Sequence, residues 1–164
     1  MKTTKKGFTL IELIVVIAII GVLAAILVPS MLGYVKKSKI SSANSAASSI
    51  YKAVNSAVTE FEEEDLFISE GIHTVSVSAE TADTGDAGAG DVYAAIFNYF
   101  DGIKKCDGAK FNISGGTCNA AACKTGKYLG SYPAGVVTAK NWNTWKNKDE
   151  GDVLAEAINR ANGS

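Results

Sequence analysis

The chain has 164 residues, enough for one domain beyond an N-terminal apolar segment, and its formal net charge is −1. Its 16 Lys and Arg are balanced by 17 Asp and Glu. This composition argues against a specific nucleic-acid partner, because phosphate contact requires clustered basic side chains. The sequence contains no phosphate-binding, zinc-protease or serine-hydrolase motif, and its one histidine, His73, lies in a predicted strand. We therefore expect a structural or binding protein that is not an enzyme and needs no cofactor.

The first thirty residues contain a basic leader followed by a long apolar run. The leader holds three lysines and ends at Gly7, and residues 8–28 then carry a single charge, Glu12. About 20 apolar helical residues at about 1.5 Å each match the hydrocarbon thickness of a bilayer, so this run is long enough to span a membrane. A charge inside such a helix costs about 2.5–3.5 kcal/mol, so we expect Glu12 to have a functional partner.

Two simpler interpretations of this segment leave Glu12 unexplained. A secretory signal peptide has a shorter apolar stretch, of about 7–15 residues, and an acidic residue at its start weakens the signal. A plain single-span anchor has the right length but no use for a carboxylate.

The segment KKGFTLIEL at residues 5–13, followed by an apolar helix, resembles the N-terminus of a type IV prepilin. The motif combines a basic leader that ends in Gly, a Phe directly after it, and a Glu five residues after the Gly. The resemblance covers about the first 35 residues, and similarity in helix pattern continues to about residue 61.

This resemblance implies a role for each motif residue. A membrane prepilin peptidase would cut after Gly7, and the new N-terminal residue, Phe8, would be N-methylated. Glu12 would meet the terminal amine of a neighbouring subunit during assembly, where two opposite charges relieve each other's desolvation. The helix would bend at Pro29, and the stretch from Gly21 to Pro29 can lose its helical structure in filaments of this family.

The resemblance also implies partners and a location. The precursor would be a single-pass protein of the cytoplasmic (inner) membrane with its globular head outside. The peptidase, a pilus assembly platform and other copies of the chain would be its partners. The product would be a surface filament that serves adhesion, motility or DNA uptake. Removal of the leader takes away three of the basic side chains and leaves the mature chain mildly acidic.

A second periodic pattern follows the apolar run. Between residues 31 and 61, apolar residues recur at steps of three and four, which predicts an amphipathic helix continuous with the span, about 50 residues and about 80 Å in total. The chain thus divides into a leader (1–7), the membrane and assembly half of the helix (8–28), its amphipathic half (29–61) and a globular head (62–164). The predicted buried stripe is Ile40, Ala43, Ala47, Ile50, Val54, Ala57, Val58 and Phe61.

The head is predicted to be a small antiparallel sheet packed on the long helix, an α+β arrangement typical of pilins. An acidic cluster, Glu60 and residues 62–65, marks the end of the long helix; it is either a solvated face or a partner for Lys104 and Lys105. Strands are expected at 72–79, around Phe111 and Ile113, and within 126–137. One helix is expected from an Asp91 cap to about residue 98, and Gly102 is expected to prevent it from continuing. A second helix is expected from an Asp152 cap to Arg160. Gly115 and Gly116 predict a turn, and Trp142 and Trp145 a final strand or loop.

Three cysteines lie in the head. In an oxidising compartment two of them can pair and leave one thiol, and both Cys118–Cys123 and Cys106–Cys123 are plausible pairs. The chain departs from the disulfide near the C-terminus that many pilins carry, because no cysteine follows Cys123. A zinc site is a weak alternative, since the cysteines form no CxxC pair.

Two other functions remain open. A pseudopilin of a type II secretion or competence system could bind calcium near the C-terminus, where the available acids are Asp149, Glu150 and Asp152. The acids of the loop at 80–91, Asp83 and Asp86 with Asp91, fit no known calcium spacing. A filament-displayed adhesin could stack glycan on Trp142 and Trp145, with Tyr128 and Tyr132 nearby; burial of these rings would argue against it.

Overall fold

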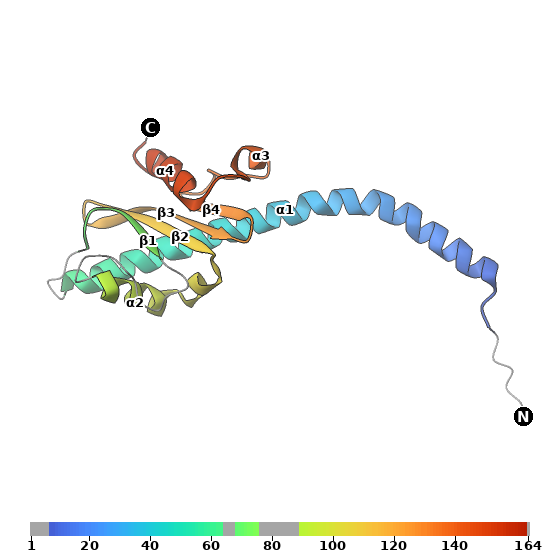
Figure 1. Cartoon of the computed structure of the whole chain (residues 1–164), viewed down its shortest axis with the longest axis horizontal. Helices are drawn as coiled ribbons and strands as arrows, with labels where there is room; N and C mark the ends of the chain where they lie inside the picture. Colours follow the sequence, from blue (N-terminus) through green and yellow to red (C-terminus); the bar gives the residue numbers. More distant parts are fainter. Residues whose placement is uncertain (1–6, 64–67, 76–88, 164) are drawn as a thin grey trace, which may run out of the picture. The chain divides into compact units, whose positions relative to one another are not determined.

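The computed structural model describes residues 7–63, 68–75 and 89–163, which fall into two units, residues 1–36 and 37–164 (Figure 1). The long helix α1, Leu10–Glu63, runs through both units. The remaining elements belong to the second unit, the head. They are β1 (Gly71–Val75), α2 (Ala89–Tyr99), the 3₁₀ helix η1 (Asp101–Lys105), β2 (Gly108–Ser114), β3 (Thr117–Thr125), β4 (Tyr128–Tyr132), α3 (Trp142–Trp145) and α4 (Glu150–Ala161).

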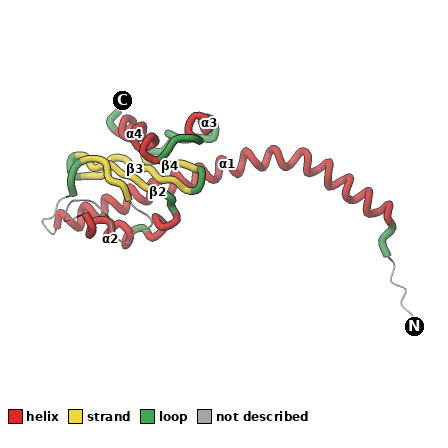
Figure 2. Tube along the Cα trace, in the orientation of Figure 1, coloured by secondary structure: helices red, strands yellow, loops and turns green. Residues whose placement is uncertain are grey.

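The four strands form one antiparallel sheet in the order β1-β2-β3-β4 (Figure 2). The β2–β3 turn is made by Gly115 and Gly116, whose φ angles of 64° and 73° suit glycine. A bulge between Asn112 and Ile113 interrupts the β2–β3 register, and there Asn112 Nδ2 donates to Asn119 Oδ1 at 2.8 Å. The α+β class and the glycine turn are as predicted.

The sheet buries both of its faces. One face packs on the head half of α1, on α2 and on η1, while the other packs on α3 and α4 (Figure 1). Strand β3 serves both layers, because Ala121 and Cys123 belong to the first cluster and Ala120 and Ala122 to the second. The predicted stripe of α1 is confirmed in full, since all eight of its residues are buried.

Two asparagines of α1 bind backbone groups of the sheet. Asn44 Oδ1 accepts from Ser131 N–H on β4 at 3.0 Å. Asn55 Oδ1 accepts from Cys118 N–H at 3.0 Å, and its Nδ2 donates to Cys118 O at 3.3 Å. These bonds satisfy backbone groups close to the helix and fix its register against the sheet.

Strand β4 crosses α1 at Gly130 with almost no space between the two backbones. A Cβ atom at this position would lie 2.1 Å from both the carbonyl carbon and the oxygen of Ala43. The helix and the strand can therefore approach each other only where the strand carries glycine.

Several predicted boundaries in the head were wrong. Helix α2 begins at Ala89 rather than at an Asp91 cap, and η1 continues the helical path through Gly102. Val136 and Val137 are buried in a turn instead of a strand. The two tryptophans lie in the short helix α3.

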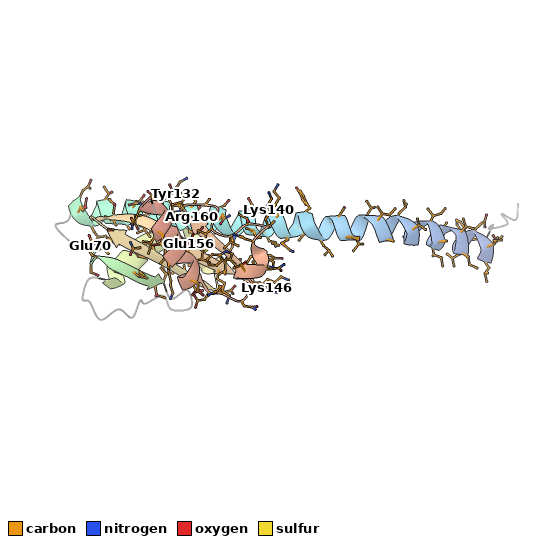
Figure 3. The ribbon with its side chains drawn as sticks, turned by 90° about the horizontal axis from the view of Figure 1, so that it is seen from above. Glu70, Tyr132, Lys140, Lys146, Glu156 and Arg160 are labelled. Atoms are coloured by element: carbon orange, nitrogen blue, oxygen red, sulfur yellow. The ribbon has the colours of Figure 1, made fainter. Side chains whose placement is uncertain are left out.

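The last helix begins earlier than predicted. Asp149, not Asp152, is the N-cap of α4: its side chain accepts from Gly151 N–H at 2.8 Å and from Asp152 N–H at 3.0 Å. Asp152 completes a capping box by accepting from Asp149 N–H at 3.2 Å. Arg160 lies in the last turn, as predicted, and pairs with Glu156 (Figure 3).

Other predictions concern segments that are described only in part. Strand β1 covers 71–75, and residues 76–79 of the predicted strand, like Asp83 and Asp86, lie outside the described residues. Of the acidic cluster, Glu60, Glu62 and Glu63 end α1, whereas residues 64 and 65 are not described. Glu60 accepts a hydrogen bond from Tyr99 at 3.1 Å, and Lys104 pairs with Asp101 at 3.0 Å.

Candidate assembly segment

Helix α1 begins directly after Thr9, and Thr9 and Glu12 bind each other. Thr9 N–H and Thr9 Oγ1 donate to Glu12 Oε2 at 2.8 and 2.7 Å, and Glu12 N–H donates to Thr9 Oγ1 at 3.4 Å. This is a capping box, in which the N-cap and the third helical residue satisfy each other's backbone donors. Sequence reasoning missed this local role, although the Thr-x-x-Glu spacing that signals it lies within residues 9–12.

The apolar half of α1 exposes its large side chains on every face (Figure 3). Phe8 is 88% exposed, and the exposed apolar residues after it range from 43% at Val35 to 76% at Tyr34. By length and composition this part of the helix could cross a membrane. A helix that is apolar all round is normally buried, so this surface requires a covering that the described residues do not supply.

Gly21 and Pro29, the predicted site of bending, both lie inside the continuous helix. Pro29 cannot donate to the carbonyl of Ala25, so one helical hydrogen bond is missing there. Beside this gap, Ser30 Oγ donates to Leu27 O at 3.2 Å. The loss of helix expected in filaments stays a prediction for these residues.

The three cysteines are buried free thiols in one core cluster. The thiols of Cys106 and Cys123 are neighbours that shift each other's pKa, downward for Cys106 and upward for Cys123. The Cys118 thiol donates to Ala120 O at 3.4 Å, and burial raises its pKa to about 12. Cys118 and Cys123 are five residues apart in one strand, about 16 Å, whereas a disulfide requires Cα atoms within about 7 Å. Of the two pairs that the sequence left open, Cys118–Cys123 does not fit this strand geometry.

The aromatic rings that an adhesin would need for stacking pack into the head. Trp142 is only 8% exposed and packs against Tyr128, with ring centroids 5.0 Å apart and planes inclined by 34°. Trp145 is half-buried against the same cluster, and the Tyr132 ring packs at a tilt against that of Tyr51. These aromatic rings cover the core of the head, so they give no support to the adhesin alternative.

The acidic residues near the C-terminus have structural partners. Asp149 and Asp152 cap α4, and Asp152 also lies 3.6 Å from Lys148. Among the described residues, no group of three or more His, Cys, Asp or Glu gathers to hold a metal ion. His73 is half-buried on β1, with its Nε2 2.8 Å from Ser69 O, and its ring stacks on Phe111.

Comparison with known proteins assigns the N-terminal motif to a family. Residues 2–28 match the model of the prokaryotic N-terminal methylation motif. The chain is 34% identical over 130 residues to the type IV major fimbrial protein FimA of Dichelobacter nodosus, a match that covers 79% of this chain and 83% of that relative. The chain belongs to the type IV pilins. The similarity to FimA extends far beyond the motif and includes most of the head.

Other relatives match over shorter stretches. A second FimA of Dichelobacter nodosus is 38% identical over 96 residues, which cover 54% of this chain and 62% of the relative. The type IV major pilin protein PilE1 of Neisseria gonorrhoeae is 46% identical over 61 residues, 37% of this chain and 34% of that one. No solved structure matches the pilin significantly. These relatives are fimbrial and pilin proteins, so the chain is a structural subunit and not an enzyme.

Proposed function

We propose that this pilin is made as a membrane-anchored precursor, cut after Gly7, methylated on the amine of Phe8 and polymerised into a surface filament. One observation carries this proposal: the helix that follows the methylation motif is apolar on all sides, and its large side chains are not covered by the part of the chain that the structure describes. A bilayer covers such a helix before assembly, and the helices of neighbouring subunits can cover it afterwards.

Glu12 is proposed to select the neighbour. Both hydrogen bonds from Thr9 go to Glu12 Oε2, so Oε1 is the oxygen that we assign to the Phe8 ammonium of an adjacent subunit. In the low-dielectric core of a helix bundle, an unpaired charge costs several kcal/mol, and a carboxylate beside an ammonium offsets much of that cost. The capping box holds the Glu12 side chain at the start of the helix, next to the proposed new N-terminus.

The prepilin peptidase and the assembly platform are proposed partners in this sequence of events. The precursor would sit in the cytoplasmic membrane with residues 37–164 outside. Gly21 and Pro29 are proposed as the place where the helix loosens during assembly, because Gly is permissive and Pro already removes one hydrogen bond. The fimbrial relatives favour a pilus over a secretion pseudopilin.

Substitution of Gly7 by valine tests the cleavage step. Nothing lies within 4 Å of a Cβ added at Gly7, so this change should leave the fold intact and act only on recognition by the peptidase. We expect full-length precursor to accumulate in the membrane fraction, measured by the intact mass of the purified chain. The wild type should begin at Phe8 and carry one extra methyl group.

Gly33→Ala is the matched control, because a Cβ added at Gly33 also meets nothing within 4 Å. This variant should be processed like the wild type. Normal cleavage of the Gly7→Val chain after residue 7 would refute the assignment of the leader.

A further inference from the structure

The head contains one pair of cysteines that can be bridged. Cys118 pairs with Ile113 near the β2–β3 turn, whereas Cys123 pairs with Ala109 at the other end of the hairpin. Cys106 lies just before β2, at this second end, in the same core cluster as Cys123, and its thiol interacts with that of Cys123. Cys118 is therefore separated from both other cysteines by about five strand residues, roughly 16 Å, which is too far for a disulfide.

Backbone bonds hold Cys106 in this place. The N–H of Asp107 donates to Lys124 O at 2.7 Å, and the Asp107 carboxylate accepts a hydrogen bond from Gly126 N–H. These two bonds tie the residue after Cys106 to the end of β3, directly beyond Cys123. They therefore hold Cys106 at the Cys123 end of the hairpin and away from Cys118.

Cys106 can also be reached from outside the core. A hollow of about 370 Å³ opens beside it and is lined by Ser45, Ser49, Lys105 and Thr125. The contact with Cys123 is the largest of the effects that lower the pKa of the Cys106 thiol, while the same contact and burial raise the pKa of Cys123. Cys106 is thus the thiol that an oxidant meets first, and as the stronger acid it forms the reactive thiolate.

We propose that Cys106 and Cys123 form the disulfide of this head and that Cys118 stays a free thiol. The oxidant is a disulfide-bearing thiol oxidant of the extracytoplasmic side. The Cys106 thiolate attacks one sulfur of that disulfide, which breaks its S–S bond and releases one thiolate. Cys123 then loses its proton to solvent and attacks the Cys106 sulfur, which releases the second thiolate. Two cysteines are oxidised and one oxidant disulfide is reduced.

The bond fits its surroundings. The Cys123 thiol donates to Ala43 O at 3.3 Å, and this contact is lost on oxidation. Ala43 lies inside α1, where its carbonyl oxygen still accepts the helical hydrogen bond from the N–H of Ala47. No backbone group is therefore left unsatisfied. The disulfide would tie η1, which covers α1, to the middle layer of the head.

Incubation of the purified full-length chain in detergent with oxidised and reduced glutathione tests the pairing. Before alkylation, we expect the oxidised chain to be two hydrogens lighter than the reduced chain. After alkylation in denaturant, it should carry one alkyl group, on Cys118, where the reduced chain carries three. The melting temperature of the head should rise by about 10 °C on oxidation, as expected for a loop of this length. Three alkylated cysteines after oxidation, or a bond that includes Cys118, would overturn the proposal.

Cysteine variants identify which cysteine is bonded to Cys106. Trypsin leaves Cys118 and Cys123 in the same peptide, residues 111–124, so the Cys118→Ala chain is required to identify the linked residue. Cys118→Ala should oxidise fully and give a peptide joined to residues 106–110. Cys106→Ser should keep two free thiols and show no rise in melting temperature. If Cys118→Ala failed to oxidise while folded by near-UV circular dichroism, the pairing would be wrong.

Formation of the Cys106–Cys123 disulfide in the cell requires the proposed placement of the head outside the cytoplasm. Rapid acid quenching and alkylation of intact cells should show Cys106 and Cys123 protected from alkylation. Reduced cysteines in cells, combined with full oxidation of the purified chain, would overturn the outward placement rather than the pairing. Failure of the purified chain to oxidise would overturn the pairing whatever the location of the head.

Discussion

The Glu12→Gln pilin is expected to be processed normally but to form at least about 100-fold fewer surface filaments. Glutamine is accepted at the third position of a capping box, so the start of α1 should stay intact. The neighbour's Phe8 ammonium, however, would lose its carboxylate partner inside the bundle. Breaking a buried pair on one side costs about 3–5 kcal/mol, and each 1.4 kcal/mol is a factor of ten. Filaments sheared from cells, quantified against total pilin, give the measurement.

Thr9→Ala separates the cap from the charge. This variant removes the Oγ1 donor and acceptor of the capping box and keeps the Glu12 carboxylate. Loss of an N-cap side chain costs about 1 kcal/mol, so assembly should fall far less than in Glu12→Gln. A loss in Thr9→Ala as large as that in Glu12→Gln would mean that the cap matters as much as the charge, and abundant filaments from Glu12→Gln would contradict the pairing.

The Gly130→Ala head is expected to lose at least about 3 kcal/mol of folding free energy, the upper end of the range for overpacked cores. The new methyl group would overlap the backbone of Ala43, and a helix backbone cannot move aside as a flexible side chain can. For a head of this size the melting temperature should fall by about 10 °C or more. Both tryptophans lie in the head, so near-UV circular dichroism follows its unfolding separately from the apolar helix.

Gly108→Ala is the matched control for this prediction. Gly108 is also a strand glycine, but the atoms nearest to its added Cβ belong to the carboxylate of Glu150, which can swing away. Its melting temperature should change by a few degrees at most. A Gly130→Ala head as stable as Gly108→Ala would contradict the close crossing of β4 and α1.

The sequence pattern predicts the long helix well because its signals are local and agree. Unbroken steps of three and four between Ile40 and Phe61 leave one face to bury, and that face is the buried one. The turn at Gly115 and Gly116 is equally clear, since both residues require a positive φ. The N-terminal motif is also readable, because its basic, small, aromatic and acidic residues have fixed spacing.

Strand β3 could not be predicted from its own residues. Its central Ala-rich stretch, residues 120–122, is buried on both faces, so it lacks alternation, and alanine is a poor strand former. The packing of α3 and α4 on the second face of the sheet was missed for the same reason. Only a strand that is recognised as buried on both faces would indicate that a helix covers that second face. The cap of α4 was misplaced by three residues because Asp149 and Asp152 both satisfy the cap pattern, and together they form the box.

The candidate site divides in the same way. The Thr9–Glu12 contact is contained in one turn of helix and could have been predicted from its spacing. The choice of Cys106 over Cys118 depends on strand register, which three cysteine positions in a sequence do not determine. The proposed partner of Glu12 belongs to another molecule, so no pattern within the chain can locate it.

The most direct test is the composition of filaments sheared from cells that express this pilin, analysed by the mass of the subunit's N-terminal peptide. We expect filaments made mainly of this chain, each copy beginning at N-methylated Phe8. Filaments that lack this chain, or copies that retain residues 1–7, would contradict the proposal that the apolar helix is first an anchor and then the core of a polymer.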